Sequence, residues 1–288
     1  MNDYLLSVLL GIIEGLTEYL PVSSTAHLRI AEALLHVPLG SGYWKMYTIV
    51  IQLGAILCLP IYFRERIAKF LSTFPRGERG DRTILTHPLG LTIVAFVVTA
   101  IPAFLLAKVI GKNLESLAII GTSLFIGGVV MWVVDARTAG SKSAATQHME
   151  DMTLRQSIWI GVCQLVSAVF PGTSRSMATI TGGQLVGMSR ASALEFSFFL
   201  SMPTMAAGTG YELLKFLMGK DDNPLGVAQI DSHGWIVLAI GFVVSFVVAY
   251  GSVAWFMAWV RKHGFVPFAV YRLVLGAAVL LWAFAPGS

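Results

Sequence analysis

The chain has 288 residues, of which 56% are hydrophobic and only 12% charged, and its formal net charge is +4. Soluble globular domains carry about 25% charged residues, so this composition excludes an ordinary soluble domain and favours a helical membrane protein. The small positive charge is spread over loops, which argues against a nucleic-acid partner and for contact with membrane lipids.

The first apolar segment, residues 4–36, is broken in its middle by polar residues and by Pro21. Its polar part reads Glu14-Gly-Leu-Thr-Glu18-Tyr-Leu-Pro21-Val-Ser23-Ser24-Thr25-Ala-His27. Irregular backbone at membrane depth is stable only where protein or a wet cavity satisfies its polar groups. We therefore expect a re-entrant hairpin of two half-helices, and polar groups at such a place usually mark a functional site.

The two glutamates of this hairpin, Glu14 and Glu18, are four residues apart and so share one face of a half-helix. Pro21 ends that half-helix. The next half-helix begins in a run of hydroxyls, and a helix N-terminus in a low dielectric is an anion site. The candidate caps and phosphate ligands are Ser23, Ser24 and Thr25.

His27 lies three residues after Ser24, so an imidazole and a hydroxyl can approach each other. A hydroxyl, a general base and an orienting carboxylate are the parts of an activated nucleophile. Ser24, His27 and a glutamate of this hairpin could supply those three parts.

Further along the chain, residues 156–190 form a second broken segment, interrupted at Pro171-Gly172. The other long apolar segments are uninterrupted and are expected to span the membrane. These six segments are 47–63, 88–112, 117–135, 194–216, 234–260 and 266–285.

The two broken segments resemble each other at an offset of 150 residues, without a gap: Gly11 matches Gly161, Glu14 matches Gln164, Pro21 matches Pro171, Ser23 matches Thr173 and Ser24 matches Ser174. Three spans follow each hairpin, so the second copy must be upside down relative to the first. This predicts an inverted-topology repeat with its site where the copies meet. We expect one membrane domain, with repeat one at about 1–135, a linker at about 136–155 and repeat two at about 156–288.

The second hairpin supplies Thr173-Ser174-Arg175-Ser176. Its hydroxyls are candidate phosphate ligands, and the guanidinium of Arg175 has the geometry to bind phosphate through two hydrogen bonds. Ala168 and Met177 stand where the first copy has Glu18 and His27. One copy thus carries acid–base groups and the other a cationic clamp, a combination that favours phosphate hydrolysis.

Basic residues set the expected orientation. Residues 64–87 hold six Lys or Arg side chains and should be cytoplasmic, together with 136–155 and Arg261-Lys262. Loop 217–233, with Asp221, Asp222 and Asp231, then falls outside.

A further group of polar residues is expected to support the site or the packing around it. Gln164 and Gln52 are candidate hydrogen-bonding groups, and Arg190 and Glu195 a candidate ion pair bracing the second hairpin. Arg272 falls near an expected segment end, where a long cationic side chain can snorkel to the interface.

Glu14–His27 and Pro171–Ser176 closely resemble the two signature motifs of the bacterial undecaprenyl-diphosphate phosphatase family of the bacitracin-resistance type, and Val50–Leu57 and Met188–Leu200 are also similar to it. The resemblance implies an integral inner-membrane enzyme that hydrolyses undecaprenyl diphosphate to the monophosphate and so recycles the lipid carrier of peptidoglycan synthesis. It also implies a divalent cation, Mg²⁺ or Ca²⁺, for which Glu14 and Glu18 are the candidate ligands. Separately, we expect the active-site cavity to open to the external side.

Carried onto this chain, the family's acidic pair is Glu14 and Glu18, its hydroxyl near the scissile phosphate is Ser24, its motif histidine is His27 and its diphosphate clamp is Arg175. Many members have Gly where this chain has Ala26, a small change.

Three alternatives stay open. His27, or water activated by the glutamates, is a rival nucleophile, and a flippase or transporter of a polyprenyl phosphate is the alternative function, because transporters share the inverted-repeat plan. A homo-oligomer is compatible with the sequence. The other lipid-phosphate phosphatase class, with a Ser-Arg-x5-His-x3-Asp motif, is excluded because Thr181 and Leu185 occupy its His and Asp positions.

Overall fold

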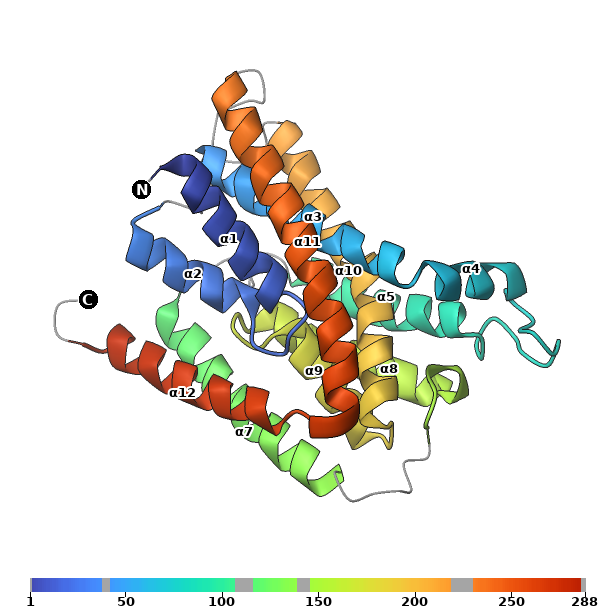
Figure 1. Ribbon diagram of the computed structural model, residues 1–288. Coiled ribbons are helices and arrows are strands. Elements are labelled where there is room, and N and C mark those ends of the chain that lie inside the picture. The colour runs from blue at the N-terminus through green and yellow to red at the C-terminus, as the bar shows by residue number, and fades with distance from the viewer. Residues whose placement is uncertain (1, 38–41, 107–115, 139–145, 219–229, 286–288) are drawn as a thin grey trace. The chain divides into compact units, whose positions relative to one another are not determined.

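The computed structural model describes residues 2–37, 42–106, 116–138, 146–218 and 230–285, and within these the chain is helical (Figure 1). The predicted hairpins are confirmed as helix–turn–helix units, α1 with α2 and α8 with α9. The helices are α1 (Asp3–Thr17), α2 (Ser24–Leu35), α3 (Gly42–Tyr62), α4 (Arg64–Thr73), α5 (Pro88–Leu105), α7 (Leu117–Thr138), η1 (Met149–Asp151), α8 (Leu154–Val169), α9 (Arg175–Leu185), α10 (Arg190–Leu217), α11 (Ser232–His263) and α12 (Val266–Ala283).

The chain divides into two compact units. The first contains Met1–Tyr19, Ser24–Tyr62 and Met202–Ala254, and the second contains Leu20–Ser23, Phe63–Ser201 and Trp255–Ser288. Each unit takes elements from both halves of the chain. A hairpin followed by long helices occurs twice along the described sequence, as expected, while the inversion of one copy stays a prediction.

In the first unit, small residues bring α1 and α3 against α11. A Cβ atom on Gly15 would lie 2.7 Å from the Ser245 carbonyl oxygen, and one on Gly54 would lie 2.5 Å from the Phe242 carbonyl oxygen. Close approach of this kind lets helices pack in lipid, where association depends on van der Waals contact and hydrogen bonds. The Ser7 hydroxyl adds such a bond, donating to the Val237 carbonyl at 2.7 Å.

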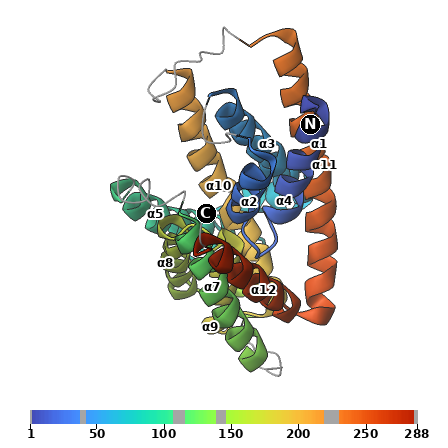
Figure 2. The ribbon, with the colours of Figure 1, turned by 90° about the vertical axis from the view of Figure 1, so that its left-hand side faces the viewer.

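In the second unit, α7 runs beside α12, and α5 and α9 pack on α8 (Figures 1 and 2). Glycines again allow close contact: a Cβ atom on Gly276 would lie 2.7 Å from the Phe125 amide nitrogen, and one on Gly161 would lie 2.7 Å from the Ala95 carbonyl oxygen. The Thr99 hydroxyl donates to the Gly161 carbonyl at 2.8 Å. These contacts fix α8, which leads into the second turn.

The described chain is a multi-pass membrane protein. Five of its helices, α3, α5, α7, α11 and α12, are long and apolar enough to cross a bilayer. Large apolar side chains face outward, as Leu105 and Leu281 do, each 76% exposed. The sequence predicted six spans. The remaining one, over 194–216, corresponds to α10, which is long enough to cross a bilayer but not apolar enough.

Helix α10 is more polar than the other predicted spans because its first half packs inside the protein. Ser192, Ser197 and Ser201 are all buried within the protein, so this half is not a lipid-facing surface. Asp221 and Asp222, together with the end of the span predicted over 88–112, lie outside the described residues.

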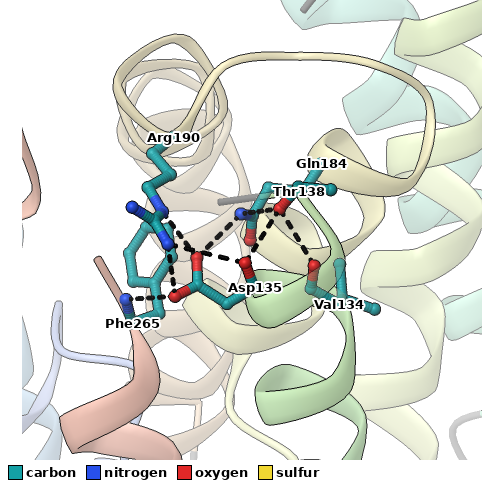
Figure 3. A network of polar contacts seen from close by, with 6 residues as sticks. All are labelled: Val134, Asp135, Thr138, Gln184, Arg190 and Phe265. Atoms are coloured by element: carbon teal, nitrogen blue, oxygen red, sulfur yellow. Dashed lines mark hydrogen bonds and ion pairs between the residues drawn. The ribbon is translucent and has the colours of Figure 1, made fainter. Parts of the chain in front are cut away.

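The expected ion pair between Arg190 and Glu195 is wrong. Arg190 instead donates to Asp135, at 2.7 Å from Nε to Oδ1 and 2.9 Å from Nη2 to Oδ2 (Figure 3). Asp135 is fully buried and also accepts from Gln184 Nε2 and from the Phe265 amide. Glu195 pairs with Arg66.

The prediction failed because the two partners of Arg190 and Glu195 lie far away in sequence, where spacing gives no signal. The result is a structural node: Asp135 ties the last turn of α7 to α9, to the start of α10 and to the start of α12 (Figure 3). A buried carboxylate with this many donors is a stable arrangement only because each lone pair is used.

Candidate active site

The first hairpin turns where the predicted proline stands. Helix α1 ends at Thr17, and Glu18 caps it, its amide donating to the Glu14 carbonyl at 2.9 Å. Both carboxylates are buried, with Glu14 0% and Glu18 6% exposed. Burial of two acidic side chains one helical turn apart is costly, and it marks this end of α1 as functional.

Ser24 begins α2, and its hydroxyl donates to Glu18 Oε2. A hydroxyl has a single hydrogen, so a Ser24 that donates to Glu18 cannot also donate to His27. In this structure the carboxylate of Glu18 is the group that accepts the Ser24 proton in a hydrogen bond, while the role of His27 as the base stays a prediction. His27 lies half-buried on the same helix.

The second hairpin is built from local signals. Thr153 and Gln156 form a capping box that starts α8, and Ser174 caps α9 by accepting from the Met177 amide at 3.4 Å. Gly172 has φ +90°, and a Cβ atom there would lie 2.5 Å from the Ile120 carbonyl oxygen. Only glycine combines that backbone conformation with that approach to α7.

The two turns share a backbone feature. Ser23 has φ 74° and Ser174 has φ 69°, and each immediately precedes the first residue of its half-helix. Left-handed backbone at a residue other than glycine costs of order 1–3 kcal/mol and gathers at functional sites. Each turn thus ends in a strained serine that is followed directly by the first residue of a half-helix.

This feature also corrects the gap-free alignment of the hairpins. Two residues lie between Pro21 and the start of α2, and three lie between Pro171 and the start of α9. Beyond the prolines the true offset is therefore 151, so Ser23 corresponds to Ser174. Arg175 then occupies the place of Ser24, the first residue of the half-helix.

Sequence reasoning missed Arg272, which was expected to snorkel to an interface. It is 0% exposed in the middle of α12, and its guanidinium donates to three backbone carbonyls. Nη1 bonds to Pro21 and Nη2 to Gly172 and Ser123, each at 3.1 Å. The turn of the first hairpin, Leu20–Ser23, is thereby joined to the turn of the second.

Two features describe the surroundings of the Arg272 guanidinium. A Cβ atom on Gly127 would collide with its Nη2, so α7 needs glycine there to admit the guanidinium. Among the described residues no carboxylate pairs with it, and its buried Nε has no hydrogen-bond partner. The positive charge therefore stays uncompensated beside two turns suited to anions. The only signal in the sequence was an arginine within an apolar segment.

Ser176 strengthens the same junction, because its hydroxyl donates to the Leu20 carbonyl at 3.0 Å. It also contacts the Ser174 hydroxyl at 3.0 Å. The Ser176 hydroxyl hydrogen thus holds the first turn on the second hairpin in this structure, and phosphate binding by Ser176 stays a prediction.

The remaining predicted residues differ in their surroundings. Thr173 and Gln164 are buried in the second hairpin, and Arg175 is half-buried at the start of α9. Thr25 is exposed on α2. Gln52 on α3 accepts from the Thr209 hydroxyl at 3.4 Å, which gives it a packing role between α3 and α10.

The carboxylates can be tested against the expected metal. Among the described residues, no three His, Cys, Asp or Glu side chains gather closely enough to hold a metal by themselves. Mg²⁺ is usually held by one or two carboxylates together with phosphate oxygens and water. Glu14 and Glu18, buried and one turn apart, fit the protein's share of such a site.

The fold and these residues define a class: a multi-pass helical membrane protein in which one broken segment carries a carboxylate–hydroxyl pair and the other an arginine at the start of its second helix. Within that class the chain belongs to the family of the bacitracin resistance protein BacA, whose family model matches residues 7–278.

Named relatives agree over nearly the full length. An "Undecaprenyl-diphosphatase" of Koribacter versatilis is 66% identical over 285 residues, covering 98% of this chain and 99% of the relative. Proteins of the same name are 38% identical in Caldanaerobacter subterraneus, over 94% of this chain and 93% of the relative, and 39% identical in Rhizorhabdus wittichii, over 96% and 97%.

Proposed function

We propose that this protein hydrolyses undecaprenyl diphosphate to undecaprenyl phosphate and orthophosphate. The observation that carries the proposal is the hydrogen bond from the Ser24 hydroxyl to the buried Glu18 carboxylate at the start of α2. Family membership and the shared name of the relatives support the substrate. By returning the carrier lipid to use, the reaction serves peptidoglycan synthesis and confers resistance to bacitracin.

In the first step, Ser24 Oγ attacks the terminal phosphorus and its proton passes to Glu18. The bond from that phosphorus to the bridging oxygen breaks, and undecaprenyl phosphate leaves. Water then attacks the phosphoserine, with Glu18 guiding the protons, and orthophosphate is released. General base catalysis of this kind contributes about 10²–10⁴-fold.

The second hairpin binds the negatively charged diphosphate. Arg175 binds its oxygens, and the hydroxyl of Thr173 adds a neutral donor. His27 hydrogen-bonds the leaving or transferred group. A divalent cation held by Glu14 and Glu18 would supply further charge neutralisation at the phosphate.

The experiment is orthophosphate release from undecaprenyl diphosphate by purified protein in detergent. Wild type should release orthophosphate, and Glu18→Ala and Arg175→Ala should abolish release. Substrate binding without release would overturn the proposal and favour the alternative, a flippase or transporter of a polyprenyl phosphate.

The cellular setting is part of the same proposal. The protein resides in the bacterial inner membrane, with the basic segment 64–87 in the cytoplasm and the site open to the external side. The positive-inside rule supports this orientation, because the segment contains Arg64, Arg66, Lys69, Arg76, Arg79 and Arg82.

A further inference from the structure

The second unit contains an apolar groove of about 610 Å³ whose walls come from α7, α8 and α9. Its lining includes Ile126 and Val130 of α7, Val166 and Phe170 next to the end of α8, and Thr173 and Leu185 at the two ends of α9. We call it the α7–α9 groove. Of the predicted catalytic and phosphate-binding residues, Thr173 is the one that lines this groove.

Three contacts between the walls give the groove a direction. A Cβ atom on Gly172 would meet the Ile120 carbonyl oxygen at 2.5 Å, one on Gly127 would meet Met177 Cε at 2.8 Å, and one on Gly182 would meet Cys163 Sγ at 2.8 Å. The lining residues Thr173, Thr181 and Leu185 follow one another along this hairpin, so the groove runs from the second turn along α9, away from its N-terminus.

The ends of the groove differ in chemistry. At the turn, Thr173 directly precedes Ser174 and Arg175, the residues suited to an anion. Along its length the groove is lined mainly by apolar side chains, and several of them are exposed, among them Val130, Val166 and Leu185. A molecule that fills it with its head at the turn must have an anionic head and an apolar chain.

We propose that the α7–α9 groove holds the first isoprene units of the prenyl chain, counted from the diphosphate. This inference rests on the proposed function and names the part of the same site that recognises the lipid. Pockets for small ligands have volumes of roughly 300–1,000 Å³, so the groove holds one section of the chain and leaves the rest in the bilayer.

The chain offers a matched pair of substitutions on α7. Val130 lines the groove and is 40% exposed, whereas its neighbour Val129 is 42% exposed and does not line the groove. Both already face the surroundings of the protein, so tryptophan at either place adds a similar bulk without entering the core.

Val130→Trp should raise KM for undecaprenyl diphosphate by about tenfold or more, because a filled pocket rejects the chain that it normally accepts. Val129→Trp should leave KM unchanged. Inhibition by inorganic pyrophosphate, which has the head and no chain, should be the same in both variants and in wild type. Equal KM values in the two variants, or a parallel loss of pyrophosphate inhibition in Val130→Trp alone, would overturn the proposal.

A direct readout uses farnesyl diphosphate bearing a diazirine near its head. Cross-linking should label α7, α8 or α9 and should be displaced by undecaprenyl diphosphate but not by an equal amount of phosphatidylglycerol. Label elsewhere, or equal displacement by both lipids, contradicts a substrate groove. If wild type releases no orthophosphate at all, the proposed function fails; if it does and the two tryptophan variants behave alike, only the groove proposal fails.

Discussion

At the scale of single residues, the pair Ser24 and Glu18 is the centre of the account. Sequence spacing brought both residues into the candidate site but assigned the proton of Ser24 to His27. In the structure the Ser24 hydroxyl donates directly to Glu18, which is the base in the proposed mechanism. Spacing along a helix indicates which side chains are neighbours, but the turn at Pro21 decides which neighbour a hydroxyl meets.

Ser24→Ala and Glu18→Gln should each lower kcat by about 10²–10⁴-fold. Because the two side chains act as one unit, the double variant should be no slower than the slower single variant. The measurement is a double-mutant cycle on orthophosphate release with intact folding checked by thermal unfolding. If the kcat losses of the two single variants multiply in the double variant, Ser24 and Glu18 act independently, which would contradict a joint role through their hydrogen bond.

Arg272 is the second residue on which the account depends. Arg272→Met should lower the melting temperature and kcat together, because buried carbonyls left without a donor cost about 1–3 kcal/mol each. Arg272→Lys should recover part of both, since it keeps the charge and some of the bonds. Gly127→Ala, which crowds the guanidinium, should act in the same direction. A normal melting temperature in Arg272→Met would disprove the junction.

His87 offers a pH-dependent test outside the membrane-spanning segments. It caps α5 by accepting from the Leu89 amide at 3.2 Å, which requires an unprotonated Nδ1. Burial, and then the charge of Arg82, lowers the pKa of His87 from 6.5. Its contribution to stability is thus complete above pH 6.5 and is lost as pH falls through the lower folded-state pKa.

His87→Asn keeps a capping group and removes the titration. We expect the melting temperature of wild type to fall more than that of the variant between about pH 7.5 and 5.5, the range around an unperturbed histidine. Equal slopes would show that His87 does not contribute in this way.

At the scale of elements, both hairpins could be predicted because proline, glycine and hydroxyl residues interrupt apolar runs at Pro21 and Pro171. The extra residue in the second turn could not be predicted, because the two segments match without a gap up to the prolines and the insertion lies after them. The pairing of Asp135 with Arg190 was also beyond reach, because it joins residues 55 positions apart (Figure 3). Helix α10 is less apolar than the other predicted spans, and its buried serines show that its first half packs against protein.

Helix packing in the first unit gives an element-scale prediction. Gly54→Ala should destabilise the protein by about 1–3 kcal/mol, because the new Cβ would lie 2.5 Å from the Phe242 carbonyl oxygen. The control is Gly251→Ala on α11, where nothing lies within 4 Å of the new atom. That change should be neutral or slightly stabilising. Thermal unfolding in detergent measures both, and equal effects would refute close packing at Gly54.

At the scale of the whole molecule, composition alone identified a multi-pass helical membrane protein, and the two motifs identified its family. Which elements join into compact units could not be read from the sequence. Each unit combines helices from both halves of the chain, so local patterns carry no information about the partners.

Orientation is a testable property at this scale. In a chain with Cys58→Ala and Cys163→Ala, a cysteine at the exposed Arg79 should react with an impermeant maleimide in inside-out vesicles only. One at the exposed Ser232 should react in intact spheroplasts. The cysteine-free chain is the control for background labelling. The reverse pattern would place the basic segment outside and contradict the proposed topology.

The most direct test of the central claim is to trap the phosphorylated enzyme. Acid quenching of the protein during turnover of undecaprenyl diphosphate labelled in its terminal phosphate should leave label on Ser24, and Ser24→Ala should remove it. Acid destroys phosphohistidine, so a parallel alkaline quench is needed. Label on His27, or turnover with no labelled protein under either quench, would contradict attack by Ser24.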